Sequence, residues 1–343
     1  MSELRLAHDL GRALALERRG VTLFRYVYRP ETPTVESPKP YFHPIHTLRG
    51  NPVTIFRPHD HVWHKGLAMT AAHLSGQNFW GGPTYERDRG YVQLENNGTV
   101  EHLTWEKLPA ENDGSLSVHE HLRWRTQSGE SWISEERWID LDGIDEACGW
   151  WALGLTFQLS NGSGQELVFS SPTVEGRPLA GYGGLFWRGP RDFTGGQILA
   201  GGGLEGPEVM GQAAPWLAFV GRHDGSGDSS TVLFVDGPSN PRHPTKWFVR
   251  STPYACISAA FMFDEPYVLP PEQTLTLRYR VVIADGALTR EQLDARAATV
   301  GPSPSGRTGP DSVPSPRPTQ RVPGTRRGIE CDALAWNGPL GSR

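Results

Sequence analysis

Long hydrophobic runs are absent from this chain, and cysteine is scarce. No apolar run approaches the roughly 20 residues that a membrane-spanning helix needs, so we expect no membrane partner. The cysteines, Cys148, Cys256 and Cys331, are widely spaced and odd in number, which indicates no disulfide framework and favours a reducing compartment. The N-terminus carries a charged residue within its first few positions and no apolar stretch, so no secretory signal is predicted. Together these absences predict a cytoplasmic protein.

An excess of positive charge is missing too. The formal net charge is −5 and no basic run precedes the C-terminal tail, so we expect no nucleic-acid partner. A phosphate-binding loop, a Ser-His-Asp nucleophile signature and a paired-cysteine metal motif are all lacking. Strands do not alternate with helices along the chain, which argues against a Rossmann or barrel enzyme fold. These absences leave enzymes and binding proteins whose chemistry depends on other side chains.

Turn formers and aromatic residues are abundant, with 40 glycines, 29 prolines and 12 tryptophans in 343 residues. This composition is typical of many short strands joined by turns. Apolar and polar residues alternate as in half-buried strands, so Val118, Leu122 and Trp124 share one face. Strands are predicted at 4–9, 21–28, 53–56, 118–126, 132–140, 150–159, 167–169, 231–235 and 275–284. We therefore predict an all-β fold, a large antiparallel β-sandwich of two packed sheets.

One helix is predicted after the last strand. Thr289 and Gln292 form a capping box, and Leu288 and Leu293 stand at the two positions of a hydrophobic staple. These signals predict a C-terminal helix over about 290–299.

The chain beyond the helix changes in composition. Pro, Ser, Gly and Arg dominate there, and such a segment buries too little apolar surface to order itself. Residues 1–300 are predicted to form a single β-sandwich domain with its core at about 20–286, and residues 301–343 a disordered tail.

Residues 59–66 read His-Asp-His-Val-Trp-His-Lys-Gly and concentrate imidazole, carboxylate, amine and indole groups. His59 and His61 share one side of an extended backbone, whereas His64 needs a turn to join them. Such a cluster can bind a metal, move protons or hold a polar ligand. One hypothesis is a divalent metal held by His59, His61 and His64, and the other is proton transfer by His61 and His64.

Residues 240–247 form a second candidate, Asn-Pro-Arg-His-Pro-Thr-Lys-Trp. Its two prolines restrict the backbone around Asn240, Arg242 and His243, so these side chains lose little entropy on binding a ligand. An arginine beside an aromatic residue is suited to carboxylates, phosphates and the faces of sugars. A rigid turn whose arginine pairs with a surface acid is the alternative.

Other polar signals are weaker. His43 precedes a proline in an aromatic stretch, and Glu175 shares strand parity with Arg177. His119 and His121 alternate with arginines along one strand, which is typical of a solvated or inter-sheet polar face.

Five blocks of sequence, taken in their order along the chain, carry a resemblance to a known protein family. They are Phe42-His43-Pro44, residues 60–67, Met210-Gly211 with Trp216, residues 238–247 and residues 275–286. Over about residues 20–286 this set resembles the bacterial PmoA-like family. The resemblance implies a galactose-mutarotase-like supersandwich whose concave sheet face gathers, around a sugar-like ligand, His61, His64, Arg242 and His243.

This chain departs from the family pattern at three positions. Trp63 replaces an imidazole found in many relatives, and Gly237 and Phe248 also stand where relatives often carry histidine. These replacements favour a ligand cavity with an aromatic platform over a multi-histidine metal site.

The residues and the resemblance together predict a carbohydrate-active enzyme that uses histidine acid–base chemistry on a sugar or oxidised sugar, as an epimerase, mutarotase or lyase. The catalytic residues would be His61, His64, His243 and Arg242. The substrate-binding residues would be His43, Asp60, Trp63, Lys65, Trp80, Glu175, Asn240 and Trp247. A metal-dependent enzyme with a divalent metal as cofactor and a non-catalytic carbohydrate-binding protein are the alternatives. No other cofactor is expected.

Overall fold

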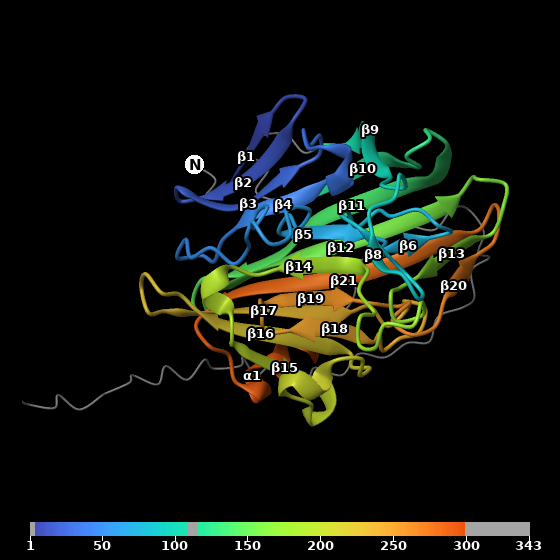
Figure 1. Ribbon diagram of the computed structural model, residues 1–343. Helices are drawn as coiled ribbons and strands as arrows, with labels where there is room; N and C mark the ends of the chain where they lie inside the picture. Colours follow the sequence, from blue (N-terminus) through green and yellow to red (C-terminus); the bar gives the residue numbers. More distant parts are fainter. Residues whose placement is uncertain (1–3, 109–115, 299–343) are drawn as a thin grey trace, which may run out of the picture.

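Antiparallel strands form two eight-stranded sheets that pack face to face (Figure 1). The computed structural model describes residues 4–108 and 116–298. Within these ranges no helix is long and apolar enough to cross a membrane. The predicted β-sandwich is confirmed, whereas the predicted tail, 301–343, lies outside the described residues.

The first sheet has the strand order β1-β2-β3-β4-β5-β14-β19-β18. Its strands are β1 Leu4–Asp9, β2 Ala13–Arg18, β3 Val21–Val27, β4 Tyr41–Ile45, β5 Leu67–Thr70, β14 Gly184–Arg188, β19 Cys256–Ala259 and β18 Trp247–Arg250.

The second sheet has the order β15-β16-β17-β21-β12-β11-β10-β9. Its strands are β15 Gln197–Ala200, β16 Trp216–Arg222, β17 Ser229–Asp236, β21 Thr274–Asp285, β12 Trp150–Asn161, β11 Ser131–Asp145, β10 Ser117–Arg125 and β9 Thr99–Lys107.

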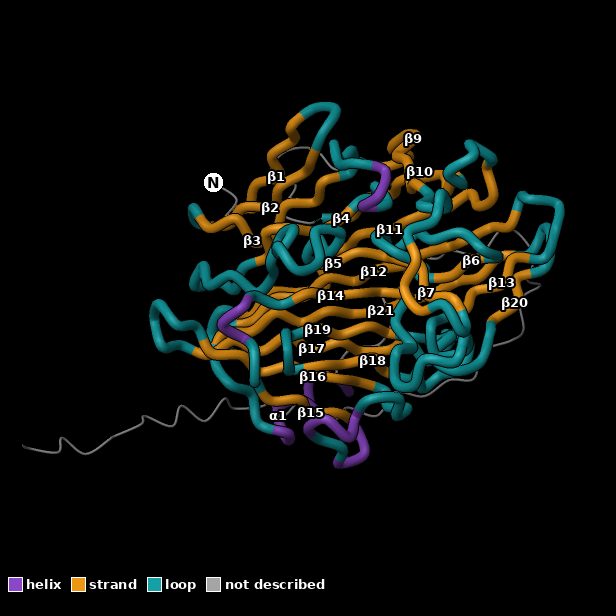
Figure 2. The backbone as a smooth tube through the Cα atoms, viewed as in Figure 1, coloured by secondary structure: helices purple, strands orange, loops and turns teal. Residues whose placement is uncertain are grey.

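Smaller elements lie around the two sheets (Figure 2). A three-stranded sheet contains β20 Tyr267–Leu269, β13 Leu167–Ser170 and β6 His73–Leu74, and a hairpin contains β7 Thr84–Glu86 and β8 Gly90–Val92. The helical segments are α1 Arg290–Ala298 and the short 3-10 helices η1 Thr34–Glu36, η2 Arg191–Phe193, η3 Gly201–Gly203 and η4 Gly206–Val209.

Aromatic side chains from both sheets fill the space between them. The ring of Trp187 on β14 lies 5.5 Å from the ring of Phe219 on β16. Because successive strand residues point to opposite faces, Phe186 points outward from the sandwich. On β18, Trp247 likewise points into the sandwich and is completely buried, whereas Phe248 points outward. The outer face of the first sheet therefore carries aromatic side chains as well.

The capping box and staple predicted for the helix are present. The Thr289 backbone N–H donates to Gln292 Oε1 at 2.9 Å, and the Gln292 backbone N–H donates to Thr289 Oγ1 at 3.4 Å. Leu288 and Leu293 are buried in one cluster against the outer face of the second sheet. The predicted C-terminal helix is confirmed as α1.

The strand predicted at 53–56 is wrong. The backbone makes only isolated bridges there, from His46 to Pro52 and from Phe56 to Lys65. Proline has no backbone N–H to donate, so the proline before this segment and the one after it prevent a continuous ladder. Residues 52–66 consequently belong to the irregular connection between β4 and β5.

Candidate functional site

A cavity of about 430 Å³ opens on the outer face of the first sheet. Strands β14 and β18 contribute Phe186 and Phe248, and loops supply the other walls. Aromatic rings make up half of the lining residues: Trp63, Trp80, Tyr91, Tyr182, Phe186, Phe248 and Tyr254. The cavity wall therefore combines aromatic rings with polar groups in similar measure, and the polar groups decide which ligand it can orient.

Glycines allow the histidine-rich loop to lie close to its neighbours. A Cβ atom on Gly82 would lie 2.7 Å from the ring of Trp63, and one on Gly66 would lie 2.2 Å from the backbone oxygen of Phe42. Both glycines also have positive φ, which other residues rarely adopt. Glycine at these positions lets the loop place His61 in the cavity wall.

Asp60 makes the hydrogen bonds that orient His61. Its Oδ2 accepts from His61 Nδ1 at 2.8 Å and from Arg188 Nη2 at 3.0 Å, and its Oδ1 accepts from Arg191 Nη2 at 2.7 Å. Burial raises the pKa of Asp60, but the hydrogen bonds from His61 and Arg188 outweigh burial and hold that pKa well below its usual value. Asp60 is therefore ionised at neutral pH.

His61 presents its second ring nitrogen as a proton acceptor. An ionised carboxylate only accepts hydrogen bonds, so Nδ1 of His61 must donate to Asp60 and the lone pair stays on Nε2. Burial lowers the pKa of His61, and the Asp60 carboxylate opposes this shift without reversing it. The side chain is 31 % exposed and lines the cavity. A neutral imidazole whose tautomer is set by a carboxylate has the properties of a general base.

His64 is stacked on His61, with ring centroids 4.7 Å apart and ring planes 17° apart. Its Nδ1 accepts a hydrogen bond from Arg188 Nη1 at 2.9 Å, which leaves the proton of the neutral ring on Nε2. Burial is the main cause that holds the pKa of His64 well below its usual value, and the electrostatic effect of the neighbouring His61 adds to it. Its Nε2 is buried without a hydrogen-bond partner among the described residues. His64 is thus a neutral ring that packs against the candidate base.

Tyr254 packs edge-on against both imidazoles, with its ring centroid 5.1 Å from that of His61 and 6.0 Å from that of His64. The buried guanidinium of Arg188 lies 3.6 Å from the centroid of the Tyr254 ring, a cation–π distance. Burial raises the pKa of Tyr254 to about 12, so its phenol stays protonated and can donate a hydrogen bond into the cavity.

Two further arginines give the cavity a positive character. Arg177 donates to the hydroxyl of Tyr91, which lies 2.9 Å from the hydroxyl of Tyr182. The guanidinium of Arg250 lies 5.0 Å from the ring centroid of Phe248. None of the described residues that line the cavity is acidic. This balance of charge favours a ligand with an anionic group.

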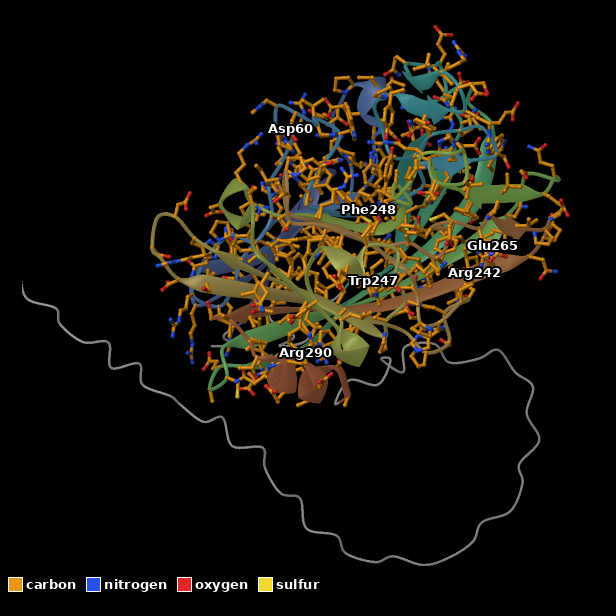
Figure 3. The ribbon with its side chains drawn as sticks, turned by 60° about the horizontal axis from the view of Figure 1, so that its bottom comes forward. Asp60, Arg242, Trp247, Phe248, Glu265 and Arg290 are labelled. Carbon is orange, nitrogen blue, oxygen red and sulfur yellow. The ribbon has the colours of Figure 1, made fainter. Side chains whose placement is uncertain are left out.

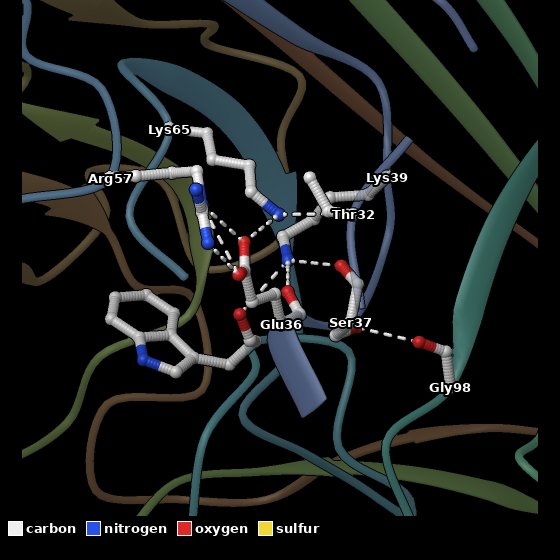
Figure 4. A network of polar contacts seen from close by, with 8 residues as sticks. Thr32, Glu36, Ser37, Lys39, Arg57, Lys65 and Gly98 are labelled. Carbon is white, nitrogen blue, oxygen red and sulfur yellow. Dashed lines mark hydrogen bonds and ion pairs between the residues drawn. The ribbon is translucent and has the colours of Figure 1, made fainter. Parts of the chain in front are cut away.

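Lys65 lies in a buried ionic network rather than in the cavity wall. Its Nζ lies 3.1 Å from Glu36 Oε2, and Arg57 binds the same carboxylate (Figure 4). Burial lowers the pKa of Lys65 to about 8. Lys39, in the same network, donates to the backbone oxygen of Trp80 at 2.9 Å. The network therefore supports a wall of the cavity from behind, and substrate binding by Lys65 stays a prediction.

Asp236 organises the residues predicted at 240–247. Its Oδ1 accepts from Asn240 Nδ2 at 2.7 Å, and its Oδ2 accepts from His243 Nδ1 at 2.7 Å and from the Thr245 backbone at 2.9 Å. Burial raises the pKa of Asp236 despite these hydrogen bonds. The block forms a polar turn whose side chains bind neighbouring parts of the chain, and none of its residues from Asn240 to Trp247 lines the cavity.

Arg242 and Trp247 are separated from the histidine-rich loop. Arg242 donates to three backbone carbonyls of residues 261–266 and pairs with Glu265 at 3.2 Å. Figure 3 shows Arg242 beside Glu265 and far from Asp60. Trp247 points into the core, where its Nε1 donates to a backbone oxygen. The structure does not bring this block to His61 and His64, although the next residue, Phe248, lines the cavity.

The remaining predicted residues lie at other places. His43 lines a second cavity of about 370 Å³ with Arg57, and burial lowers the pKa of His43 to about 4. Glu175 precedes Arg177 by two residues but does not line the main cavity. The Nδ1 atom of His59 lies 3.0 Å from the guanidinium of Arg191, outside that cavity.

The group of side chains best placed to share a metal ion lies elsewhere in the described residues. Its ligand atoms all lie within 4.8 Å of one another, and its members are His119, His121 and Glu136. In residues 59–64, by contrast, each histidine directs its Nδ1 atom towards an arginine or an aspartate. The metal site predicted in this loop stays a prediction.

Several residues of the cavity were not predicted from the sequence. Alternation along β18 places Phe248 and Arg250 on the face opposite to Trp247, and this signal was available in the sequence. Arg188 ends the otherwise apolar strand β14, which is a signal of a buried, paired charge. Tyr254 lies in a turn and has no local signal.

No curated protein matches this chain. Among solved structures, the GH36 alpha-galactosidase AgaA from Geobacillus stearothermophilus, solved in complex with raffinose, has a TM-score of 0.34 and 12% identity, covering 82% of this chain and 40% of its own. The alpha-galactosidase from Lactobacillus brevis has a TM-score of 0.36 and 10% identity, covering 86% of this chain and 41% of its own. The chain thus spans about two fifths of their length. Likeness at this level does not extend to activity.

A family model matches residues 13–298, which include every residue of the cavity. The chain therefore belongs to DUF6807, a family of unknown function.

Proposed function

We propose that this protein binds a sugar that carries a carboxylate group and that His61 acts as a general base on it. The observation that carries this proposal is the Asp60–His61 pair: Asp60 holds Nδ1, and the imidazole lines a cavity in which none of the described lining residues is acidic. A carbohydrate ligand also agrees with the mutarotase-like resemblance of the sequence blocks.

The shape and lining of the cavity support a monosaccharide-sized ligand. Its volume of about 430 Å³ falls within the range of small-molecule sites. Aromatic rings such as Trp63 and Trp80 offer apolar faces on which the C–H face of a sugar ring can pack. The Tyr254 phenol can donate to a sugar hydroxyl, because its raised pKa keeps it protonated.

The positive charge of the cavity supports an oxidised sugar over a neutral one. Arg250 and Arg177 are the cations among the described lining residues, and a guanidinium matches the geometry of a carboxylate. A neutral sugar would leave both charges without a counter-ion from the lining. A uronate would supply that counter-ion and place its carboxylate against one of these guanidinium groups.

The chemistry follows from the position of the base. His61 Nε2 would take the proton from the carbon next to the carboxylate, and the electron pair would move into the carboxylate as an enolate that an arginine stabilises. Return of a proton to the other face would give an epimer, whereas loss of the substituent on the next carbon would give an unsaturated sugar. His64 would serve as a positioning residue, because its own proton is buried.

The test compares uronates with neutral sugars on the wild-type protein, using glucuronate and galacturonate beside glucose and galactose. We expect calorimetric binding of a uronate and solvent deuterium exchange at the carbon next to its carboxylate, followed by NMR. His61→Asn should lower the exchange rate about 10²- to 10⁴-fold while changing the dissociation constant much less, because only the base is removed. His59→Asn is the matched control, since His59 lies in the same loop outside the cavity.

Three outcomes would contradict this proposal. Equal affinity for neutral and acidic sugars would show that the arginines do not bind a carboxylate. Tight binding without exchange would leave a carbohydrate-binding protein, and exchange abolished by a chelator would indicate a metal-dependent enzyme.

A further inference from the structure

Two histidines and a glutamate meet on the outer face of the second sheet. His119 and His121 alternate along β10, and Glu136 lies directly opposite His121 on β11. The other face of β10 points to the first sheet, because Glu120 accepts a hydrogen bond from Tyr26 of β3. The cluster and the main cavity therefore lie on opposite outer faces of the sandwich, and an inference about the cluster is independent of the proposed function.

The donor atoms of this cluster converge. His119 Nε2 lies 3.0 Å from Glu136 Oε2, and the ligand atoms of all three side chains lie within 4.8 Å of one another. A fourth group is close, because Glu106 Oε2 lies 3.7 Å from His121 Nε2. The set offers two imidazole nitrogens and two carboxylates from three adjacent strands.

The sheet fixes the backbone positions of these residues before any ion binds. Backbone ladders fix the spacing of β9, β10 and β11, so the positions of the three strands require no rearrangement. Trp138 stacks on His119, with ring centroids 4.2 Å apart and ring planes 16° apart, which restricts rotation of that imidazole. The side chains of His119, His121 and Glu136 are 16%, 30% and 41% exposed, so an ion can reach them from solvent.

We infer that this cluster is a binding site for a divalent transition metal, with zinc as the best match. Bonds of about 2.0–2.1 Å in a tetrahedral site place neighbouring donor atoms about 3.3 Å apart. The donor atoms of His119 and Glu136 lie 3.0 Å apart here, and all three ligand atoms lie within 4.8 Å of one another. Small side-chain rotations therefore complete the site, with Glu106 or water as the fourth ligand. Imidazole ligands favour zinc and its neighbours over magnesium and calcium, which prefer oxygen ligands.

A simpler account is that Glu136 only accepts a hydrogen bond from His119. The two accounts differ in a measurable way, because a hydrogen-bonded pair alone has no stoichiometric affinity for zinc. The site also differs from the metal site predicted in residues 59–64, so variants in each place distinguish the two.

The experiment measures zinc binding to the full-length protein by competition with a chromophoric chelator, and zinc content by mass spectrometry after dialysis. We expect one zinc ion per chain in the wild type and a rise in melting temperature on adding zinc. His121→Ala and Glu136→Gln should each weaken binding at least about 100-fold, because each removes a direct ligand. His61→Ala should bind zinc within about threefold of the wild type, since its ring is not part of this site.

Absence of zinc binding by the wild type would overturn the inference. So would zinc binding that survives in both His121→Ala and Glu136→Gln, or that is lost in His61→Ala. Circular dichroism checks the fold of each variant, and Glu136→Gln provides the test if His121→Ala does not fold.

Discussion

At the scale of single residues, Asp60 decides what its neighbour can do. An isolated histidine exchanges its proton between two nitrogens, but a carboxylate held by two arginines admits only the tautomer with the proton on Nδ1. Burial then keeps the ring neutral by lowering the pKa of His61. The sequence pointed to this pair, since His61 and Asp60 were both among the predicted residues.

Replacing Asp60 by asparagine tests this argument. In Asp60→Asn the amide can donate to Nδ1, which moves the proton to Nε2 and removes the base, so exchange should fall about 10³-fold or more. Arg191→Gln is the matched control, because it removes one exposed contact of Asp60 without changing the tautomer, and we expect a loss below about tenfold.

The pH dependence of the exchange rate is a second test of the Asp60–His61 pair. The pKa of His61 lies below its usual 6.5, so the wild-type rate should stay constant above pH 6.5 and fall only as pH drops through the lowered pKa. A rate that instead rises on acidification would contradict a neutral His61 base.

At the scale of helices and strands, the sequence predicted correctly those elements whose stabilising contacts join residues close together in the chain. The capping box of α1 joins residues three positions apart, and the alternation of β10 and β11 reports directly on which face is buried. The segment 53–56 shows where such signals end, because its apolar residues pack irregularly between prolines. The block 240–247 shows the same limit, since Asn240 and His243 bind Asp236 and lie outside the cavity.

The cap of α1 yields a stability prediction. Thr289→Ala removes the hydroxyl that accepts the Gln292 N–H, and we expect a loss of about 0.5–1 kcal/mol in the free energy of unfolding, measured in urea. Thr289→Ser keeps the hydroxyl and should remain within about 0.3 kcal/mol of the wild type. Equal stability of the alanine and serine variants would show that Leu288 and Leu293 hold the helix without the cap.

At the scale of the whole molecule, a buried polar network joins the two sheets. Arg137 on β11 donates to Glu135 at 2.7 Å and to the hydroxyl of Tyr26 on β3 at 2.8 Å, and Tyr26 donates in turn to Glu120. All four side chains are at most 2 % exposed. Buried charges of this kind are tolerated only when paired, and here the Tyr26 hydroxyl links the charges of the second sheet to the first sheet.

Removing the cation of this network should be costly. Arg137→Met leaves Glu135 without its buried counter-charge, and we expect a loss of about 3–5 kcal/mol in the free energy of unfolding. Arg123→Met is the control, because the Arg123–Glu101 pair on the outer face of β10 is partly exposed and should contribute below about 1 kcal/mol. Similar losses in both variants would show that burial of the pair does not matter.

The sequence by itself determined the β class, the longest strands such as β10, β12 and β21, and the C-terminal helix, because two-residue alternation and capping pairs are local properties of the chain. It did not predict the short strands β14, β18 and β19, whose formation depends on pairing with distant segments. It did not determine which polar groups meet. His64 contacts Arg188 from 124 residues away along the chain, and Lys65, its immediate neighbour, points into a different network. Only the pairing of distant strands, which burial of the whole core selects, decides that His61, Tyr254 and Arg250 line one cavity while Arg242 and His243 do not.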